Sequence, residues 1–84
     1  MWYVYVLKGK SKIYVGLTDN LKRRVAQHKR GQTHSTSRMG DLKPIYYEAF
    51  ITEKDARKQE KFYKTGYGRE ILRDKLEDTL KEDY

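Results

Sequence analysis

Hydrophobic and polar positions alternate in two short segments near the amino terminus, WYVYVLK (residues 2–8) and IYVGL (residues 13–17). Alternation in β-branched and aromatic residues predicts strands. The letters between the two segments, GKSK, contain a glycine and polar side chains suited to a short turn, so the segments are expected to form a hairpin. Pairing across this turn can bring Tyr5 and Tyr14 onto one surface, and Gly16 shares the face of Tyr14.

Residues 20–30 have the spacing of a helix, because Leu21, Val25 and His28 recur on one helical face. The letters TDN at the start of this segment supply oxygens that can cap its first N–H groups. Gly31 follows two basic residues and is suited to end the helix. The polar run GQTHSTSRMGD has no periodicity and predicts a loop.

The remaining chain has one more strand pattern and two more helix patterns. KPIYYEAFI (residues 43–51) predicts a third strand, with its proline at the start, where a missing N–H does least harm. Thr52 begins TEKD, in which a hydroxyl is followed three positions later by a carboxylate, and this resembles a capping box. The helix that it opens is expected to run to about Lys64 and to be closed by Gly66. A last helix is expected over residues 69–80.

The order β-β-α-β-α-α predicts an α/β (α+β) fold in which helices flank a three-stranded, mainly antiparallel sheet. A chain of 84 residues encloses only one modest core, so residues 1–84 are expected to form a single domain. The absence of cysteine excludes disulfides and thiolate metal sites and favours a reducing, cytoplasmic location. No apolar run approaches the roughly 20 residues that span a bilayer, and the amino terminus has a strand pattern instead of a signal-peptide pattern, so a soluble, untargeted protein is expected.

Charge is unevenly distributed along the chain, which has a formal net charge of +7. Residues 1–40 contain nine Lys and Arg residues and one acid, Asp19, whereas the remainder contains ten basic and eleven acidic residues. This segregation favours contact between the amino-terminal half and phosphates, although a membrane surface or a simple excess of exposed lysines would also account for it. The candidate nucleic-acid contacts are Lys8, Lys12, Arg23, Lys29, Arg30 and Arg38.

Two pairs of residues in this basic half carry candidate chemistry. Tyr5 and Tyr14 beside Gly16 would surround open space that could hold a water and a phosphate, but paired tyrosines on a small sheet are also ordinary packing. Arg24 and His28 are four residues apart and point to the same side of a helix. An arginine fork suits phosphate oxygens and a histidine exchanges protons near neutral pH, although the pair also fits a solvated basic face.

Glu60 is the candidate in the second half of the chain. It follows Ala56 by one helical turn and precedes Lys64 by another, within ARKQEKFYK. A small residue and an acid on one helical face allow close approach to the sheet and one buried carboxylate. The same spacing also fits a surface ion pair between Glu60 and Lys64.

Taken in order, the segments YVYVL, IYVG, NLKRRVAQHKRG and ARKQEKFYK resemble the GIY-YIG nuclease family, in which four such blocks surround one active site. The likeness covers essentially the whole chain and is greatest to the small single-domain bacterial members. Excision-repair, homing and some restriction endonucleases contain the same module, with further domains that choose the DNA.

By this resemblance, one active site is made of Tyr5, Tyr14, Arg24, His28 and Glu60. The two tyrosines belong to the two half-motifs, where YVY stands for the name-giving GIY and YVG for YIG. Arg24 corresponds to the catalytic arginine and His28 to its associated histidine. Glu60 corresponds to the metal-binding glutamate.

The arginine position has a second, less suitable candidate, and two other positions of the family pattern have no single match. Arg23 neighbours the arginine position, but only Arg24 has the four-residue spacing to His28. A polar residue that many members place after the glutamate helix has the candidates Lys64, Arg69 and Glu70. A further polar group that some relatives supply from a loop has the candidates His34, Ser35, Thr36 and Ser37.

The resemblance implies hydrolysis of phosphodiester bonds in DNA with Mg²⁺, for which Mn²⁺ should substitute. Glu60 would supply one carboxylate to a hydrated cation, and Arg24 would clamp the phosphate. Tyr5 would take the proton of the attacking water, Tyr14 would hold the water or phosphate, and His28 would orient the tyrosine or pass a proton. Because a phenol with a pKa of about 10 is a poor base, we expect the basic half of the chain to lower the pKa of Tyr5.

So small a domain has little surface for reading bases, so we expect low sequence specificity or a protein partner that supplies it. The main alternative is a non-catalytic module that keeps the fold and binds nucleic acid. An isolated carboxylate in the matched set argues against that alternative, because it would repel phosphates. A protein-interaction domain has no positive feature in its favour.

Overall fold

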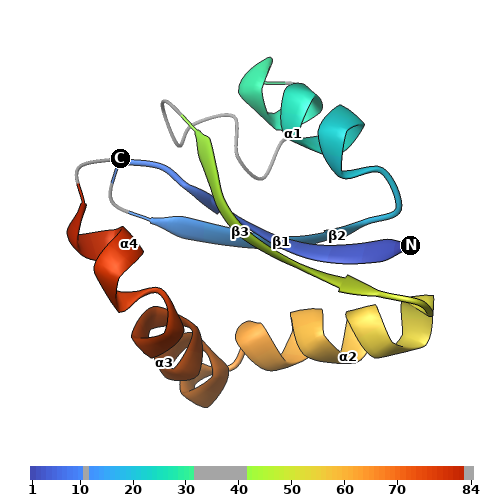
Figure 1. Cartoon of the computed structure of the whole chain (residues 1–84). Helices are drawn as coiled ribbons and strands as arrows, with labels where there is room; N and C mark the ends of the chain where they lie inside the picture. The colour runs from blue at the N-terminus through green and yellow to red at the C-terminus, as the bar shows by residue number, and fades with distance from the viewer. Residues whose placement is uncertain (11, 32–41, 83–84) are drawn as a thin grey trace.

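The computed structural model describes residues 1–10, 12–31 and 42–82. Its centre is a sheet of three strands, β1 (Trp2–Lys8), β2 (Ile13–Thr18) and β3 (Lys43–Phe50), in the order β2-β1-β3 (Figure 1). Both pairings of β1 are antiparallel, as predicted. Because β1 is the central strand, β2 and β3 are the two edges of the sheet.

Helices lie on both faces of this sheet. The helix α1 (Leu21–Lys29) covers one face, and α2 (Glu53–Tyr63), α3 (Gly66–Lys75) and α4 (Glu77–Lys81) lie on the other (Figure 1). The predicted fold class, an α+β arrangement with helices flanking a three-stranded sheet, is confirmed.

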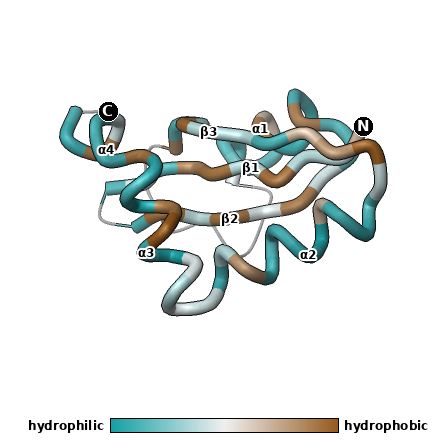
Figure 2. The backbone as a smooth tube through the Cα atoms, turned by 60° about the horizontal axis from the view of Figure 1, so that its bottom comes forward, coloured by the Kyte–Doolittle hydropathy of each residue, from teal (hydrophilic) through white to brown (hydrophobic). Residues whose placement is uncertain are grey.

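The larger hydrophobic core lies between the sheet and α2. Val4 and Val6 of β1 pack there with Ala56 of α2 and Leu72 of α3. In Figure 2 the strands carry much of the hydrophobic brown colour and α2 is largely hydrophilic teal, because only one narrow stripe of the helix is apolar. A smaller cluster on the α1 side is built around Tyr5.

The helices α1 and α2 begin where the sequence predicts, because a polar side chain caps the amino terminus of each. The side chain of Asn20 accepts a hydrogen bond from the N–H of Arg23 at 3.1 Å, and Thr52 Oγ1 accepts one from the N–H of Asp55 at 3.3 Å. At the end of α1, Gly31 has a φ of +71°, a conformation that glycine adopts without the steric cost of a Cβ atom.

The prediction that Gly66 closes the second helix is wrong. α2 ends at Tyr63, and Gly66 is the first residue of α3. The reason is that Thr65 caps a new helix, with its Oγ1 accepting a hydrogen bond from the N–H of Gly68 at 2.9 Å.

The single helix predicted over residues 69–80 is also wrong, because the chain forms two helices that meet at Leu76. This residue has φ −107° and ψ 21°, outside the helical region. Leu76 is buried, and Leu80 in α4 is packed against the same core, so the break lets both leucines contact it. Within the described ranges, no helix is long and apolar enough to cross a membrane.

Candidate active site

The strand register places Tyr5 directly opposite Gly16 on the α1 face of the sheet. A Cβ atom added to Gly16 would lie 2.4 Å from both Cζ and Oη of Tyr5, far inside van der Waals contact. The expectation of open space beside the glycine is therefore wrong, because the ring of Tyr5 fills it. Gly16 is needed because it lets the phenol lie directly against the neighbouring strand.

Replacing Gly16 by alanine is expected to lower the free energy of unfolding by about 1–3 kcal/mol, since the buried Tyr5 ring must leave its position. Urea-induced unfolding measures this change. The matched control is Gly66→Ala, because a Cβ there meets nothing within 4 Å. Equal stability of the two variants would contradict the assigned role of Gly16.

His28 completes an aromatic cluster with the two tyrosines. Its Nε2 atom lies 2.7 Å from Tyr5 Oη, and both side chains are buried. The ring of Tyr14 is centred 5.0 Å from that of His28 and 6.2 Å from that of Tyr5. α1 holds the histidine in place because its apolar residues Leu21 and Val25 pack against the same cluster.

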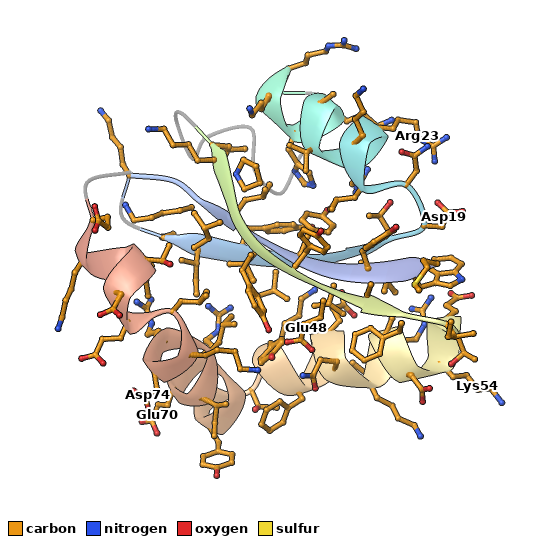
Figure 3. All side chains as sticks on the ribbon, viewed as in Figure 1. Asp19, Arg23, Glu48, Lys54, Glu70 and Asp74 are labelled. Carbon is orange, nitrogen blue, oxygen red and sulfur yellow. The ribbon has the colours of Figure 1, made fainter. Side chains whose placement is uncertain are left out.

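Arg24 belongs to the same group of side chains. It is half-buried on α1, one turn before His28, and its Nη1 donates to Gln27 Oε1 at 3.1 Å. Its guanidinium also interacts electrostatically with Tyr5. The neighbouring Arg23 instead points outward and forms an exposed ion pair, visible at the upper right of Figure 3.

Burial decides the protonation of the buried pair. Desolvation raises the pKa of Tyr5 to about 12, although a hydrogen bond and the charge of Arg24 act in the opposite direction. The expected lowering by the basic half is thus wrong for the protein alone, because the effect of burial is larger. Burial, and then the charge of Arg24, lower the pKa of His28 below 6.5. At neutral pH both side chains are therefore uncharged.

Glu60 is on the other side of the sheet, because α2 covers the face opposite α1 (Figure 1). Its side chain is 15% exposed, and its Oε2 atom accepts a hydrogen bond from Lys64 Nζ at 2.9 Å. The ion pair that the spacing allowed is therefore formed, by a carboxylate that is also largely buried. Arg69 and Glu70, the other polar candidates, are exposed on α3.

The basic residues proposed to contact nucleic acid are mostly at the surface. Lys8 is half-buried at the end of β1, and the exposed members in the described part of the chain are Lys12, Arg23, Lys29 and Arg30. Arg38 and the loop candidates His34, Ser35, Thr36 and Ser37 lie outside the described residues.

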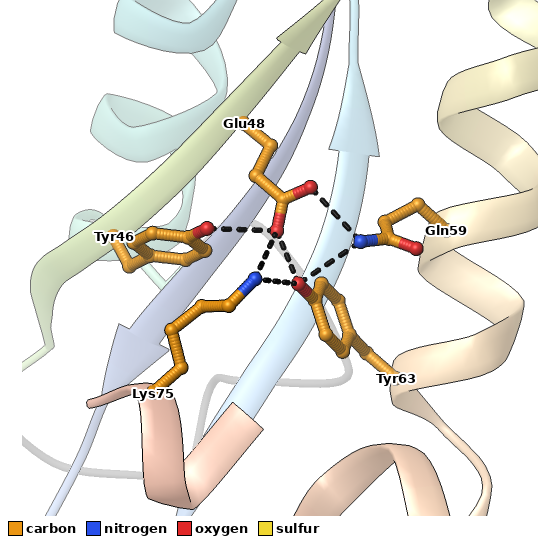
Figure 4. Close-up of polar contacts among 5 residues, drawn as sticks. All are labelled: Tyr46, Glu48, Gln59, Tyr63 and Lys75. Carbon is orange, nitrogen blue, oxygen red and sulfur yellow. Dashed lines mark hydrogen bonds and ion pairs between the residues drawn. The ribbon is translucent and has the colours of Figure 1, made fainter. Parts of the chain in front are cut away.

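A polar network on the α2 side was not predicted. Glu48 of β3 points toward α2, and its carboxylate accepts hydrogen bonds from Tyr46 at 2.8 Å, from Gln59 at 2.9 Å and from Tyr63 (Figure 4). Lys75 Nζ lies 3.6 Å from Glu48 Oε2 and 3.1 Å from Tyr63 Oη. The signal was present in the strand alternation, which puts an acid on the same face as two aromatic residues of KPIYYEAF.

This network holds Glu48 in its charged form. Burial alone would raise the pKa of the carboxyl, but hydrogen bonds from Tyr63, Tyr46 and Gln59 outweigh it and lower that pKa. Burial and the bond to Glu48 raise the pKa of Tyr63 to about 12, so its hydroxyl stays a donor. The network joins β3 to α2 and α3.

Replacing Glu48 by glutamine is expected to lower the free energy of unfolding at neutral pH by about 1–3 kcal/mol, because bonds to a charged acceptor are lost. The folded state favours the charged carboxylate, so its stabilisation is complete above the ordinary carboxyl pKa of 4.5 and is lost as pH falls through the lower folded pKa. Urea unfolding across this range should show the two proteins converging. Glu70→Gln, at an exposed carboxylate on α3 (Figure 3), is the control.

Comparison with known proteins identifies the family to which the chain belongs. The model of the family described as the GIY-YIG catalytic domain matches residues 1–77. The chain therefore belongs to the GIY-YIG family, and the resemblance found in the sequence is confirmed. The family is one of endonucleases, and its domain implies interaction with nucleic acid.

Within that family, the chain is similar to UPF0213 proteins. A "UPF0213 protein in ldhD 5′region" of Pediococcus acidilactici is 38% identical over 76 residues, covering 86% of this chain and 78% of the relative. A UPF0213 protein of Clostridium perfringens is 36% identical over 66 residues, covering 76% of this chain and 71% of the relative. The solution NMR structure of a UPF0213 protein from Bacillus halodurans matches with a TM-score of 0.54 and 28% identity, covering 86% of this chain and 82% of that one.

Proposed function

We propose that the protein is a metal-dependent nuclease that hydrolyses phosphodiester bonds in DNA with little sequence specificity. The observation that carries this proposal is the buried hydrogen bond between Tyr5 and His28, with Arg24 and Tyr14 grouped around it. Binding alone requires neither a buried phenol nor a buried neutral imidazole. This grouping therefore favours hydrolysis over a non-catalytic binding module.

The short contact between the two buried side chains supports a relay, and the lowered pKa of His28 leaves its imidazole neutral at pH 7. A neutral His28 protonated on Nδ1 can accept the Tyr5 hydroxyl proton at Nε2, which lies 2.7 Å from Oη. As that proton moves to Nε2, Tyr5 Oη takes a proton from the attacking water, so no free phenolate is required. Concerted transfer is needed because the pKa of Tyr5 is raised to about 12 and that of His28 is lowered, so a separate phenolate and imidazolium would both be disfavoured.

The remaining steps fall to the neighbouring side chains. The oxygen of the water forms a bond to phosphorus while the bond to the leaving oxygen breaks. Solvent supplies a proton to that oxygen, and His28 releases its added proton to solvent and becomes neutral again. Arg24 stabilises the negative charge that builds on the phosphate, and Tyr14 holds the water or phosphate. The exposed Lys29 and Arg30 would contact the backbone, making affinity depend on salt concentration.

In this proposal the carboxylate of Glu60 is the protein ligand of the metal ion. Among the described residues no three His, Asp or Glu side chains gather as a metal cage. Glu60 is proposed as the single protein carboxylate on the ion. That donor set suits Mg²⁺ or Mn²⁺, since such an ion keeps several waters and takes other ligands from the phosphate. When bound, the ion would supply positive charge to the phosphate.

The placement of Glu60 on α2 is compatible with this role. Gln59 and Glu60 flank the buried stripe of Ala56 and Tyr63 on opposite sides, because successive helical residues are about 100° apart. Gln59 contacts Glu48 on β3, so the flank of Glu60 is turned toward the β2 edge. Tyr14 is on that edge strand, and a phosphate at the edge can be approached from both faces.

The test is cleavage of labelled single-stranded, duplex and branched DNA, and of RNA, with Mg²⁺ or Mn²⁺ and with EDTA. We expect cleavage of DNA that requires the metal and falls about 10²-fold in Arg24→Ala. Arg57→Ala, at an exposed arginine of α2 that is not among the candidate contacts, controls for loss of positive charge and for contaminating nucleases, and should retain most activity. Binding without cleavage on every substrate would refute the proposal.

A further inference from the structure

An open groove with a volume of about 930 Å³ lies between α1 and β3, directly beside the candidate active site. Tyr5 lines this groove and also belongs to the buried cluster, so the groove and the cluster share this residue. Two further tyrosines, Tyr3 of β1 and Tyr47 of β3, lie along the groove, and Lys22 of α1 is on its wall. The reaction steps assigned to the site use none of these last three residues.

We propose that this groove binds one unpaired nucleobase beside the phosphate that reacts, and that Tyr47 and Tyr3 are the surface on which the base stacks. The inference rests on the proposed function and deepens it, because it names unpaired DNA as the substrate class. The nucleotide would place its base in the groove and its phosphate at Arg24 and Tyr5.

The aromatic side chains of the groove are available to a ligand. Tyr47 lies on the edge strand β3 and is 57% exposed. Its ring centre is 5.9 Å from that of Tyr3, with an interplanar angle of 69°, so the two rings form a corner instead of covering each other. Base stacking on exposed aromatic rings is the common way in which proteins hold single-stranded nucleic acid, and it is sequence-tolerant because every base has a π-face.

The charges around the groove favour a base over a phosphate inside it. Asp19 lines the groove and is paired with the exposed Arg23, 3.7 Å away, so a phosphate there would meet a carboxylate. Lys22 belongs to the basic surface of α1, where the phosphates on either side of the base can be neutralised. These charges therefore favour a neutral base in the groove and the charged sugar-phosphate backbone along α1.

Stacking on Tyr47 requires a base that is neither paired nor stacked between adjacent bases. A base inside a duplex is stacked on both sides, and its faces cannot reach Tyr47 unless it is unpaired and turned out of the helix, which is unfavourable. Single-stranded segments, frayed ends and branch points present such bases without that cost. We therefore expect single-stranded DNA to bind more tightly than a blunt duplex of equal length.

Affinity for fluorescently labelled single-stranded DNA, measured by anisotropy in EDTA, tests the proposal without interference from cleavage. Tyr47→Ala should weaken binding about tenfold, and Tyr47→Phe should bind almost as well as the wild type, because the ring is retained. The dependence of affinity on salt should be unchanged in Tyr47→Ala, since no phosphate contact is lost. An oligonucleotide of abasic sites should bind the wild type and Tyr47→Ala equally.

The matched control is Tyr67→Ala, because Tyr67 is 67% exposed on α3, away from the α1 face. Circular dichroism and thermal unfolding verify that each variant folds, and Tyr3→Ala serves as a second variant of the groove. Equal affinities of the wild type, Tyr47→Ala and Tyr67→Ala would overturn the proposal, as would an equal loss on abasic DNA.

The outcomes also separate this inference from the proposed function. If binding depends on the Tyr47 ring but no substrate is cleaved with metal, hydrolysis is refuted and base binding in the groove is supported. Cleavage with unchanged binding in Tyr47→Ala would refute the groove and leave hydrolysis standing. Failure of the wild type to bind any nucleic acid would refute both.

Discussion

Replacing Glu60 by glutamine is expected to lower the rate of DNA cleavage on the order of 10³-fold in Mg²⁺, because the proposed metal loses its one protein carboxylate. Glutamine keeps the size and polarity of the side chain, so the fold should persist. Binding of DNA in EDTA should be unchanged or slightly tighter, since a negative charge has been removed. Single-turnover cleavage and anisotropy measure the two quantities.

Glu53→Gln is the matched control for this change. Glu53 is also on α2 and also pairs with a basic residue four positions later, Arg57, so it reproduces the loss of one charge and one ion pair. It should cleave like the wild type. Unchanged cleavage in Glu60→Gln would show that the metal site is elsewhere, and equal loss in both variants would show a general electrostatic effect.

Replacing Tyr5 by phenylalanine is expected to lower the cleavage rate about 10²- to 10⁴-fold, the usual contribution of a positioned acid or base. The ring still fits against Gly16, but the group that exchanges protons with His28 is gone. Affinity for DNA should change little, so the loss should be in the rate of the chemical step.

Tyr63→Phe provides the control, because Tyr63 is equally buried and its hydroxyl is hydrogen-bonded on the opposite face of the sheet. Both variants should lose stability, but only Tyr5→Phe should lose chemistry. Cleavage within about twofold of wild type in Tyr5→Phe would contradict the relay and direct attention to Tyr14 as the base.

Much of the fold and of the α1-face cluster followed from periodicity. Alternation along two strands was enough to put Tyr5 and Tyr14 on one surface, and four-residue spacing was enough to put Arg24 and His28 on one side of α1. These are properties of the local backbone, so they can be read before the tertiary structure is known.

Features that depend on contacts between elements could not be predicted in this way. The Tyr5 ring turns onto Gly16 because of a side-chain conformation, and the pKa of Tyr5 rises because α1 buries it. Gly66 begins a helix because the preceding Thr65 caps it, whereas a glycine near the end of a helical pattern more often ends one. Glu48 is tied to side chains up to 27 positions away in sequence, beyond the range of any periodic pattern.

Successive side chains of β1 point to opposite faces of the sheet, and the two faces have different roles. Val4 and Val6 belong to the large core, while Tyr3 and Tyr5 belong to the site and the groove. Substitutions of Val4 and Val6 should therefore mainly affect how much of the protein stays folded, and those of Tyr3 and Tyr5 should also affect how it binds or cleaves DNA. The α1 face can in principle be redesigned for a different substrate while the other face continues to hold the domain together.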